Sequence, residues 1–434
     1  MKPVVVIGAG LAGCEAAWQL AQRGIPVQLH EMKPEKFTPA HKSPLFGELV
    51  CSNSLRAGGL ENAVGLLKEE LRRCGSLIMA CADAHPVPAG GALAVDRTAF
   101  SQAVTDRIHG HPLIAVISGE VTALPEEGEV LVATGPLTSD ALAEDIARHF
   151  PGTDYLHFFD AAAPLVSFES VNMERAWFAS RYDKGTPDYI NCPMNREEYD
   201  AFWTALTAAK EAPLHDFDDG GVFEGCMPVE VMARRGHDTL CYGPLKPVGL
   251  PDPKTGREPY AVVQLRKDNA EGSIYNIVGF QTHLTFPEQR RVFGMIPGLE
   301  RAEFLRYGVM HRNTYLRSPG LLNRYYQSIT EPRLTFAGQL TGVEGYVEST
   351  ASGLTAAVEL ARRIAGKPPV NFPQETALGA LALYISNPTV GNFQPMNINF
   401  GLIPPLGYRV KGKRNKNAAL SQRALEALAA LDLE

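Results

Sequence analysis

A parallel α/β fold in two pieces, with a mixed α/β segment inserted between them, is what this sequence of 434 residues predicts. A strand–helix–strand pattern opens the chain, and a second glycine-rich junction between a strand and a helix begins at Gly338. Aromatic residues, prolines and short irregular pieces dominate the stretch between them. A chain of this length exceeds one ordinary hydrophobic core. We therefore expect a first part over residues 1–150, an insertion over 151–330, and the remainder of the first domain with C-terminal helices over 331–434.

The first elements form a strand–helix–strand unit. Residues 2–8 are a β-branched run that ends at glycine, which predicts a buried parallel strand. Residues 11–23 have alanines and a leucine on one face and predict a helix, which Gly24 ends as its C′ residue. Residues 26–31 then predict a second strand.

Residues 34–60 are rich in Pro, Gly, Ser and Asn and predict a long functional loop. The elements expected after it are helices over residues 61–73 and 96–108, strands near 113–117, 120–123 and 130–134, a parallel strand at 334–337, and helices over 349–366 and 377–386.

Three glycines between the first strand and the first helix follow the spacing G-x-G-x-x-G. Gly8 permits a tight turn, Gly10 lets the backbone approach a pyrophosphate, and Gly13 lets the helix pack close to the sheet. The pyrophosphate is then expected at the positive N-terminus of the helix. The predicted cofactor-binding segment is Gly8-Ala9-Gly10-Leu11-Ala12-Gly13, and its alternative is a glycine turn with a structural role only.

Two further positions point to the adenosine half of a dinucleotide. Glu31 ends the second strand, where a carboxylate accepts hydrogen bonds from a ribose 2′-hydroxyl and repels a 2′-phosphate. This favours FAD or NAD over NADP, although an ordinary acidic residue at a strand end is the alternative. Thr134 and Gly135 close a later strand at a place where flavoproteins often bring the chain past the adenosine.

The second glycine-rich segment distinguishes between these cofactors. A strand ends at Gly338, followed by Gln339, and Gly342 and Gly345 open a loop before a helix. Backbone N–H groups at such a helix start face a flavin pyrophosphate or the reducible edge of the flavin ring. Nicotinamide dehydrogenases rarely need a glycine loop this late in the chain. The pattern therefore predicts a two-piece FAD-binding Rossmann-like domain of the glutathione-reductase type, interrupted by the insertion.

The composition is that of an ordinary globular protein, with 45% hydrophobic and 21% charged residues. The apolar runs are too short for a membrane span, and the N-terminus has no leader pattern, so we expect a cytoplasmic protein without a membrane partner. The net charge of −7 argues against indiscriminate coating of nucleic acid. The basic residues at 409–416 then form either a solvated tail or a local basic face.

The chain has seven cysteines and no C-x-x-C pair, so the sequence predicts neither a metal site nor a disulfide framework. The thiols are then free. Most free cysteines are small core residues, and a minority are reactive. From the residues alone, an inert thiol is favoured at both Cys51 and Cys226.

Four blocks in order resemble one family across essentially the whole chain: residues 8–17, 51–56, 225–230 and 338–349. They are similar to the folate- and FAD-dependent tRNA (uracil-5-)-methyltransferases of the TrmFO family, which are related to the GidA-type flavoproteins that modify the tRNA wobble position. GidA relatives carry a long helical C-terminal extension, whereas this chain stops at Glu434, which favours the shorter methyltransferase.

The resemblance implies a reaction. The methyl carbon comes from 5,10-methylenetetrahydrofolate, reduced FAD supplies electrons, and NADH or NADPH is the outside reductant. The product is 5-methyluridine in the T arm of tRNA. Three alternatives stay open at this point: a GidA-like wobble-uridine modification, oxidation or reduction of a small molecule, and a non-enzymatic flavin-stabilised tRNA-binding factor.

The resemblance also assigns roles. Carbon 5 of uracil becomes a nucleophile once a thiolate adds at C6, and Cys226 matches that thiolate. Cys51 is then a general acid or base, or a thiol that acts where the carbon unit meets the flavin, and the reverse assignment stays open. Arg56, close in sequence, is expected to favour the Cys51 anion. Tyr346 matches an aromatic residue beside the isoalloxazine.

His283 follows a predicted strand and is a candidate for covering the folate pterin, with a satisfied core histidine as the alternative. The target uridine is stacked in the tRNA elbow and must be flipped out, so basic and aromatic residues are expected along its path. The candidates are Arg181, Tyr182, Lys184, Arg234, Arg235 and the 409–416 cluster.

Overall fold

The computed structural model describes residues 2–150, 156–161, 163–183, 185–212, 227–308, 310–390 and 393–433. Two candidates from the sequence, Lys184 and Cys226, lie outside these residues. Among the described residues, no helix combines the length and the apolar content that a membrane crossing requires.

A five-stranded parallel sheet with the order β16-β7-β1-β2-β6 is the centre of one half of the molecule. The strands β7 and β1 are apolar along their whole length because helices cover both faces, whereas β2 alternates apolar and polar residues and ends in Glu31. The strand β16 comes from the late part of the chain and pairs with β7, so distant segments build one sheet. The strands are β1 (Val4–Ile7), β2 (Val27–Glu31), β6 (Ile114–Ser118), β7 (Val130–Val132) and β16 (Leu334–Phe336).

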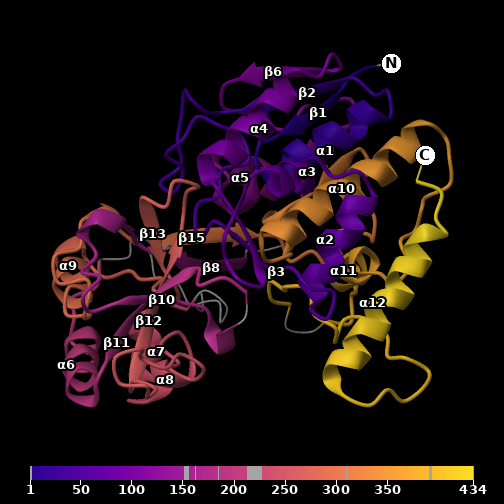
Figure 1. Cartoon of the computed structure of the whole chain (residues 1–434). Coiled ribbons are helices and arrows are strands. Elements are labelled where there is room, and N and C mark those ends of the chain that lie inside the picture. The colour runs from indigo at the N-terminus through magenta and orange to yellow at the C-terminus, as the bar shows by residue number, and fades with distance from the viewer. Residues whose placement is uncertain are drawn as a thin grey trace.

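Helices α1 (Leu11–Gln22) and α10 (Tyr346–Ile364) pack closely against each other beside this sheet (Figure 1). Their approach depends on Gly353, because a Cβ atom there would lie 2.3 Å from the carbonyl oxygen of Ala12. The glycine-rich starts of the two helices are thereby brought to neighbouring positions. Two further helices of this half are α4 (Arg97–His109) and α5 (Asp140–His149).

An outer layer of helices lies beside α10, with α12 along the edge of the molecule (Figure 1). These helices are α2 (Ala63–Arg73), α11 (Ala377–Ser386) and α12 (Lys413–Ala429), while α3 (Leu77–Ala84) packs against α1 and α4. A small antiparallel sheet with the order β3-β5-β4 accompanies them, made of β3 (Ser54–Ala57), β4 (Pro86–Val87) and β5 (Ala92–Val95).

The other half is built on a six-stranded antiparallel sheet with the order β10-β11-β12-β13-β9-β14. Its hydrophobic core runs from Val166 to Leu299 and is separate from the core under the parallel sheet. The strands are β9 (Leu165–Ser167), β10 (Trp177–Ala179), β11 (Tyr189–Met194), β12 (Ala261–Lys267), β13 (Ile274–Ile277) and β14 (Phe304–Arg306). The helices are α6 (Arg196–Thr207), α7 (Val229–Arg234), α8 (Thr239–Tyr242) and α9 (Phe286–Phe293).

A two-stranded ribbon, β8 (Leu156–Ala161) and β15 (Met310–Tyr315), lies between the two halves (Figure 1). β15 runs beside two short 3₁₀ turns of the first half, η1 (Gly135–Leu137) and η5 (Gln339–Thr341). Two other 3₁₀ turns, η2 (Phe168–Ser170) and η3 (Arg181–Asp183), belong to the second half.

Most of the predicted elements are confirmed, with shifts of a few residues at their ends. The strand predicted at 120–123 is wrong. Gly119 has a φ of +120° and turns the chain away after β6, which leaves that segment without a strand partner. The region predicted as loop over 34–60 contains β3, and Cys51 precedes this strand. Helices α3, α5 and α12 were not predicted.

Candidate functional site

The turn between β1 and α1 is built for close packing on one side and left open on the other. Gly8 has a φ of +100°, and a Cβ there would lie 2.7 Å from the carbonyl oxygen of Ala133. A Cβ on Gly13 would lie 1.8 Å from the carbonyl oxygen of Gly8. At Gly10, by contrast, no atom lies within 4 Å of such a Cβ. The backbone at the start of α1 is therefore accessible to a ligand, as a bound pyrophosphate requires.

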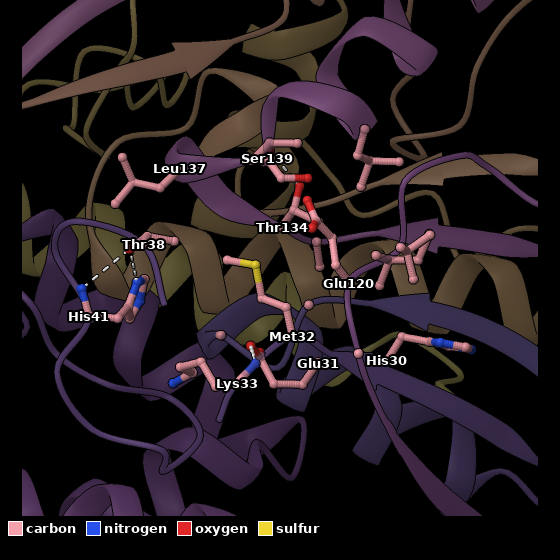
Figure 2. Close-up of a pocket in the computed structure, with 18 of the residues that line it drawn as sticks. His30, Glu31, Met32, Lys33, Thr38, His41, Glu120, Thr134, Leu137 and Ser139 are labelled. Atoms are coloured by element: carbon pink, nitrogen blue, oxygen red, sulfur yellow. Dashed lines mark hydrogen bonds between the residues drawn. The ribbon is translucent and has the colours of Figure 1, made fainter. Parts of the chain in front are cut away.

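Glu31 is fixed at the mouth of this turn. One carboxylate oxygen accepts a hydrogen bond from the backbone N–H of Ala9 at 2.8 Å, and the other accepts one from Lys33 at 3.0 Å. Glu31 and Lys33 adjoin a cavity, which Thr134, Leu137 and Ser139 close from the opposite side (Figure 2). Gly135, predicted alongside Thr134, begins η1 and does not line this cavity.

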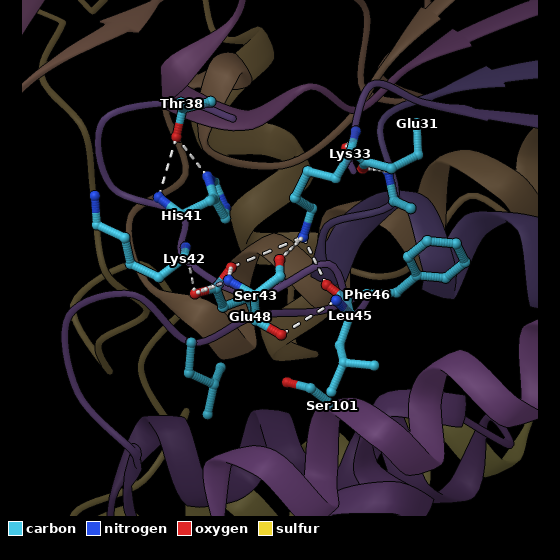
Figure 3. A network of polar contacts seen from close by, with 12 residues as sticks. Glu31, Lys33, Thr38, His41, Lys42, Ser43, Leu45, Phe46, Glu48 and Ser101 are labelled. Carbon is cyan, nitrogen blue, oxygen red and sulfur yellow. Dashed lines mark hydrogen bonds and ion pairs between the residues drawn. The ribbon is translucent and has the colours of Figure 1, made fainter. Parts of the chain in front are cut away.

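The buried side chain of Lys33 organises the loop that walls the same cavity (Figure 3). Its ammonium group donates to the carbonyl oxygens of Leu45 at 2.6 Å and Ser43 at 3.3 Å, and lies 3.8 Å from Glu48. In the same loop, burial and the nearby charge of Lys33 lower the pKa of His41 to about 4, so that its imidazole is neutral near pH 7. The sequence analysis did not single out Lys33; its position two residues after Glu31 was the available signal.

A second cavity, of about 320 Å³, lies where the two halves meet. Leu137 lines both cavities, so the two adjoin. The first half contributes Cys51, Arg56, Gln339, Gly345 and Tyr346, among others. The second half contributes Arg266, Asn276 and Gln281, and the ribbon strand β15 contributes Asn313. The two cavities together therefore follow a path from the first glycine turn to the second.

Tyr346, the first residue of α10, bonds directly to the segment that carries Cys51. Its hydroxyl oxygen accepts hydrogen bonds from the backbone N–H of Cys51 at 2.8 Å and of Ser52 at 3.2 Å. Burial, with a smaller effect of Cys51, raises the pKa of Tyr346, so the phenol stays protonated.

The second half holds the same segment from the other side. Arg266 on β12 is 8% exposed and donates to the hydroxyl of Ser52 at 2.7 Å and to the side-chain oxygen of Asn53 at 3.2 Å. The amide group of Asn53 in turn donates to the carbonyl oxygens of Lys267 at 2.9 Å and Val95 at 3.0 Å. The Cys51 segment is thus held between α10 and the antiparallel sheet. No role was predicted from the sequence for Arg266 or Asn53.

The expected contribution of Arg56 to a Cys51 anion stays a prediction, and the ion-pair partner that the structure gives Arg56 is another residue. The guanidinium of Arg56 forms an ion pair with the fully buried carboxylate of Glu348. Glu348 also accepts a hydrogen bond from the backbone N–H of Ile398 at 3.0 Å. The positive charge of Arg56 is therefore balanced within the wall of the cavity.

In the second glycine-rich segment, some residues are needed for close packing and others line the second cavity. Gly338 has a φ of +80° and donates its N–H to the hydroxyl of Ser352 at 2.6 Å, and a Cβ on Gly342 would lie 2.4 Å from the ring of Phe393. Gln339 and Gly345 line the cavity instead.

This architecture matches known proteins. The family model described as "Glucose inhibited division protein A" matches residues 3–368. A methylenetetrahydrofolate–tRNA-(uracil-5-)-methyltransferase TrmFO from Acetivibrio thermocellus is 62% identical over 423 residues, which cover 98% of this chain and 97% of the relative. One of the same name from Pelotomaculum thermopropionicum is 60% identical and covers 98% of both chains. This chain belongs to the TrmFO family.

The solved structures agree with the fold of a TrmFO-family chain. Aquifex aeolicus GidA superimposes with a TM-score of 0.71 at 16% identity, over 100% of this chain and 74% of that one. A second crystal form of the same protein gives a TM-score of 0.69. The predicted FAD-binding Rossmann-like α/β fold class and the predicted family are confirmed.

Two predicted site residues remain, Cys226 from the TrmFO resemblance and His283 from its position after a predicted strand. Cys226 lies outside the described residues, which resume at Met227, and Val229 donates its N–H to the carbonyl oxygen of Gln281 at 2.7 Å. His283 is 6% exposed and does not line the cavity. Its Nε2 forms a hydrogen bond with Glu211 at 2.5 Å, whereas its Nδ1 lies 2.8 Å from Glu230 without hydrogen-bond geometry, so two carboxylates flank a buried histidine that has one unsatisfied ring nitrogen.

The basic candidates for RNA contact have different surroundings in this TrmFO-family chain. Arg181 donates to the carbonyl oxygen of Lys246 at 2.9 Å and to Gln264 at 3.3 Å, so it holds a turn together. Arg234 is exposed and pairs with Glu211, while Tyr182 is 52% exposed. The basic residues at 409–416 are exposed, and Lys413 begins α12 rather than a tail. Arg235 is exposed beside Arg234.

Proposed function

We propose that this chain methylates carbon 5 of a uridine in the T arm of tRNA, with 5,10-methylenetetrahydrofolate as carbon donor and FAD as redox cofactor. One observation carries the proposal. In a chain of the TrmFO family, a single cavity gathers the Cys51 segment, the Tyr346 hydroxyl and the glycine-rich start of α10, next to a dinucleotide-type pocket. Relatives that share about 60% of the sequence bear the methyltransferase name, which favours this reaction over wobble modification.

The residues present fit FAD. The open backbone at Gly10 and the N-terminus of α1 suit a pyrophosphate, and Glu31 suits ribose hydroxyls because each of its oxygens retains an unused lone pair. Gln339 and Gly345, beside Tyr346, would border the ring. When bound, FAD supplies the two electrons that the transferred carbon requires.

The reaction balances with a nicotinamide reductant. The carbon of methylenetetrahydrofolate is at the oxidation level of formaldehyde and must gain a hydride to become a methyl group. Uridine, methylenetetrahydrofolate, NAD(P)H and a proton thus give 5-methyluridine, tetrahydrofolate and NAD(P)⁺. We propose that NADH or NADPH is the outside reductant and that the reaction takes place in the cytoplasm.

The chain supplies the activation of uracil. A thiolate that adds to C6 turns C5 into an enolate-like carbon, and a base later removes the proton from C5. We assign the addition to Cys226 and the proton transfer to Cys51. The Tyr346 and Arg266 hydrogen bonds to the Cys51 segment would hold that thiol in register with the base.

We further propose that tRNA binds across the two halves, with the exposed Arg234, Arg235 and the 409–416 cluster as its phosphate contacts. Residues 1–150 and 331–434 would form the FAD domain and 151–330 the inserted one. Two separate hydrophobic cores support two domains, although Tyr315, Leu316, Leu322 and Tyr326 belong to the core under the parallel sheet. Phosphate contacts of this kind predict that RNA affinity falls steeply as salt rises.

The test supplies methylenetetrahydrofolate labelled in the transferred carbon, NADH, FAD and T-arm RNA, and measures label in 5-methyluridine. Cys51→Ser and Cys226→Ser should abolish labelling. Cys74→Ser is the matched control, because burial raises the pKa of that thiol to about 12 and it does not line the cavity. An unlabelled product, a methyl group derived from S-adenosylmethionine, or full activity of both serine variants would overturn the proposal.

A further inference from the structure

A row of side chains crosses the face of the six-stranded sheet. Tyr189 on β11 pairs in register with Arg266 on β12, which pairs with Asn276 on β13. Asn276 pairs with Leu165 on β9, and Leu165 pairs with Arg306 on β14. Residues directly opposite one another in paired strands share a face of the sheet. Tyr189, Arg266, Asn276 and Leu165 therefore lie on one face, and Arg306 follows at the edge of the row, where the register of β14 shifts between Phe304 and Arg306.

Hydrogen bonds at one end of this row show which part of the molecule this face of the sheet packs against. The hydroxyl of Tyr189 donates to the carbonyl oxygen of Ala89 at 3.1 Å, and Arg266 bonds to Ser52 and Asn53. These partners all belong to the half that carries the parallel sheet. The row therefore faces the junction where Cys51 and Tyr346 line the second cavity.

The other end of the row has donors without acceptors. The amide nitrogen of Asn276 and the Nε and Nη2 atoms of Arg306 are buried and have no hydrogen-bond partner. Asn313, on β15, shows the same property: its amide nitrogen is buried and unpartnered. Asn276 and Asn313 are each 3% exposed, and both line the second cavity.

Two unpaired amides in one cavity wall need an explanation. Native structures leave few buried polar groups unsatisfied, because each such group loses its bonds to water without replacement. A ligand that offers acceptors and a donor in one plane would satisfy both residues.

We propose that Asn276 and Asn313 bind the edge of a cyclic imide in this cavity, donating hydrogen bonds to its carbonyl oxygens. The identity of the available imides rests on the proposed function. Both the target uracil and the isoalloxazine ring carry the sequence C=O, N–H, C=O, which an asparagine amide complements through its donor and its acceptor.

The cation at the end of the row adds an electrostatic contribution to this choice. Burial and the nearby Arg97 lower the pKa of Arg306 only to about 10, so its guanidinium is charged near pH 7. Arg306 lies on β14, with β9 between it and Asn276, and it does not line the cavity, so its charge acts at longer range on an imide that gains negative charge during reaction. Uracil gains such charge on its carbonyl oxygen when a thiolate adds to C6.

The experiment replaces each amide by the carboxylate of the same shape, in Asn276→Asp and Asn313→Asp. These changes put an acceptor oxygen where the amide nitrogen donated. Asn172→Asp is the matched control, because Asn172 is exposed, its oxygen accepts from the N–H of Glu174 at 3.1 Å, and aspartate retains that bond while adding the same charge. The readouts are the dissociation constant and visible spectrum of FAD, and the binding of T-arm RNA with uridine or cytidine at the target position.

If the imide is that of the flavin, we expect FAD binding to weaken about tenfold or more, the loss of one hydrogen bond, with a shifted absorption band. If it is that of uracil, FAD binding stays at the control level and the preference for uridine over cytidine falls about tenfold. Either result supports the amide pair and assigns its ligand. Values equal to those of Asn172→Asp in both arms would overturn it.

Asn276→Ser and Asn313→Ser remove the amide without adding charge and serve if the aspartate variants do not fold. The proposed function is judged separately, by label transfer in the unmodified protein. Should that transfer fail, the FAD-binding arm alone decides the amide pair, and unchanged FAD binding in the variants would overturn it.

Discussion

The phenolic oxygen of Tyr346 lies 2.8 Å from the backbone nitrogen of Cys51 and accepts its hydrogen bond, across a sequence separation of 295 residues. This contact joins the glycine-rich start of α10 to the segment that carries a proposed catalytic thiol. Arg266 holds the same segment from the antiparallel sheet. The geometry of the thiol therefore depends on both halves of the molecule.

Removing the phenolic oxygen tests this link. In Tyr346→Phe, the N–H groups of Cys51 and Ser52 lose their acceptor, and we expect the free energy of unfolding to fall by about 1–3 kcal/mol. Methylation should slow by about tenfold or more, because a thiol displaced by a fraction of an ångström is poorly aligned. Urea unfolding and the rate of label transfer measure the two effects. Tyr384→Phe is the control, since the hydroxyl of Tyr384 donates to the carbonyl oxygen of Gln394 and not to the Cys51 segment. Equal methylation rates in the two variants would contradict the proposed role of Tyr346.

Arg266 should act together with Tyr346. Arg266→Met leaves Ser52 and Asn53 without this donor, and we expect it to slow methylation as well. Tyr346 and Arg266 hold the same segment. The loss of activation free energy for methylation in the double variant should therefore be smaller than the sum of the losses in the two single variants, as is usual for residues that share a partner. A double-mutant cycle on the methylation rate measures this coupling. Strictly additive effects would show that the two anchors act independently.

The sequence predicted the parts of the site that are local. The spacing of Gly8, Gly10 and Gly13 and the position of Glu31 sufficed for the first cavity, because a strand, a turn and a helix place them without help from the rest of the chain. The register of Asn276 with Arg266, and the contact of Tyr346 with Cys51, depend on how distant strands and helices meet. No spacing along the chain contains that information.

Some misses had usable signals. Helix α5 has Leu142 and Ile146 buried four residues apart, a helical spacing that follows Ser139. The basic run before Leu420 suggested a solvated tail, although Leu420, Ala424 and Leu428 form the buried stripe of α12. Charge on one face of an amphipathic helix was thus mistaken for absence of structure. Arg56 was assigned to Cys51 by proximity in sequence, whereas its partner Glu348 comes from α10.

The glycines of the first turn should separate stability from cofactor binding. Gly13→Ala would place a methyl group 1.8 Å from the carbonyl oxygen of Gly8, so we expect a loss of several kcal/mol of stability, or failure to fold. Gly10→Ala meets no protein atom within 4 Å, so stability without FAD should change by less than about 1 kcal/mol. FAD affinity should nevertheless fall about tenfold or more, since the methyl group occupies the approach to the pyrophosphate. Thermal unfolding of the FAD-free protein and FAD titration measure both; a Gly10→Ala protein that binds FAD normally would contradict the assigned site.

His283 should make stability depend on pH. Burial opposes its protonation, but the carboxylates of Glu230 and Glu211 outweigh burial and raise the pKa of His283 above the ordinary 6.5. Protonation therefore favours the folded state: the contribution is fully present below pH 6.5 and is lost as pH rises through the raised pKa. In urea unfolding across this range, His283→Gln should show a smaller loss of stability with rising pH than the unmodified protein. Glu211→Gln, which removes one of the two carboxylates, should move the loss to lower pH. If His283→Gln retained the full pH dependence, other groups would have to cause it, and the two carboxylates would not hold a charged imidazole.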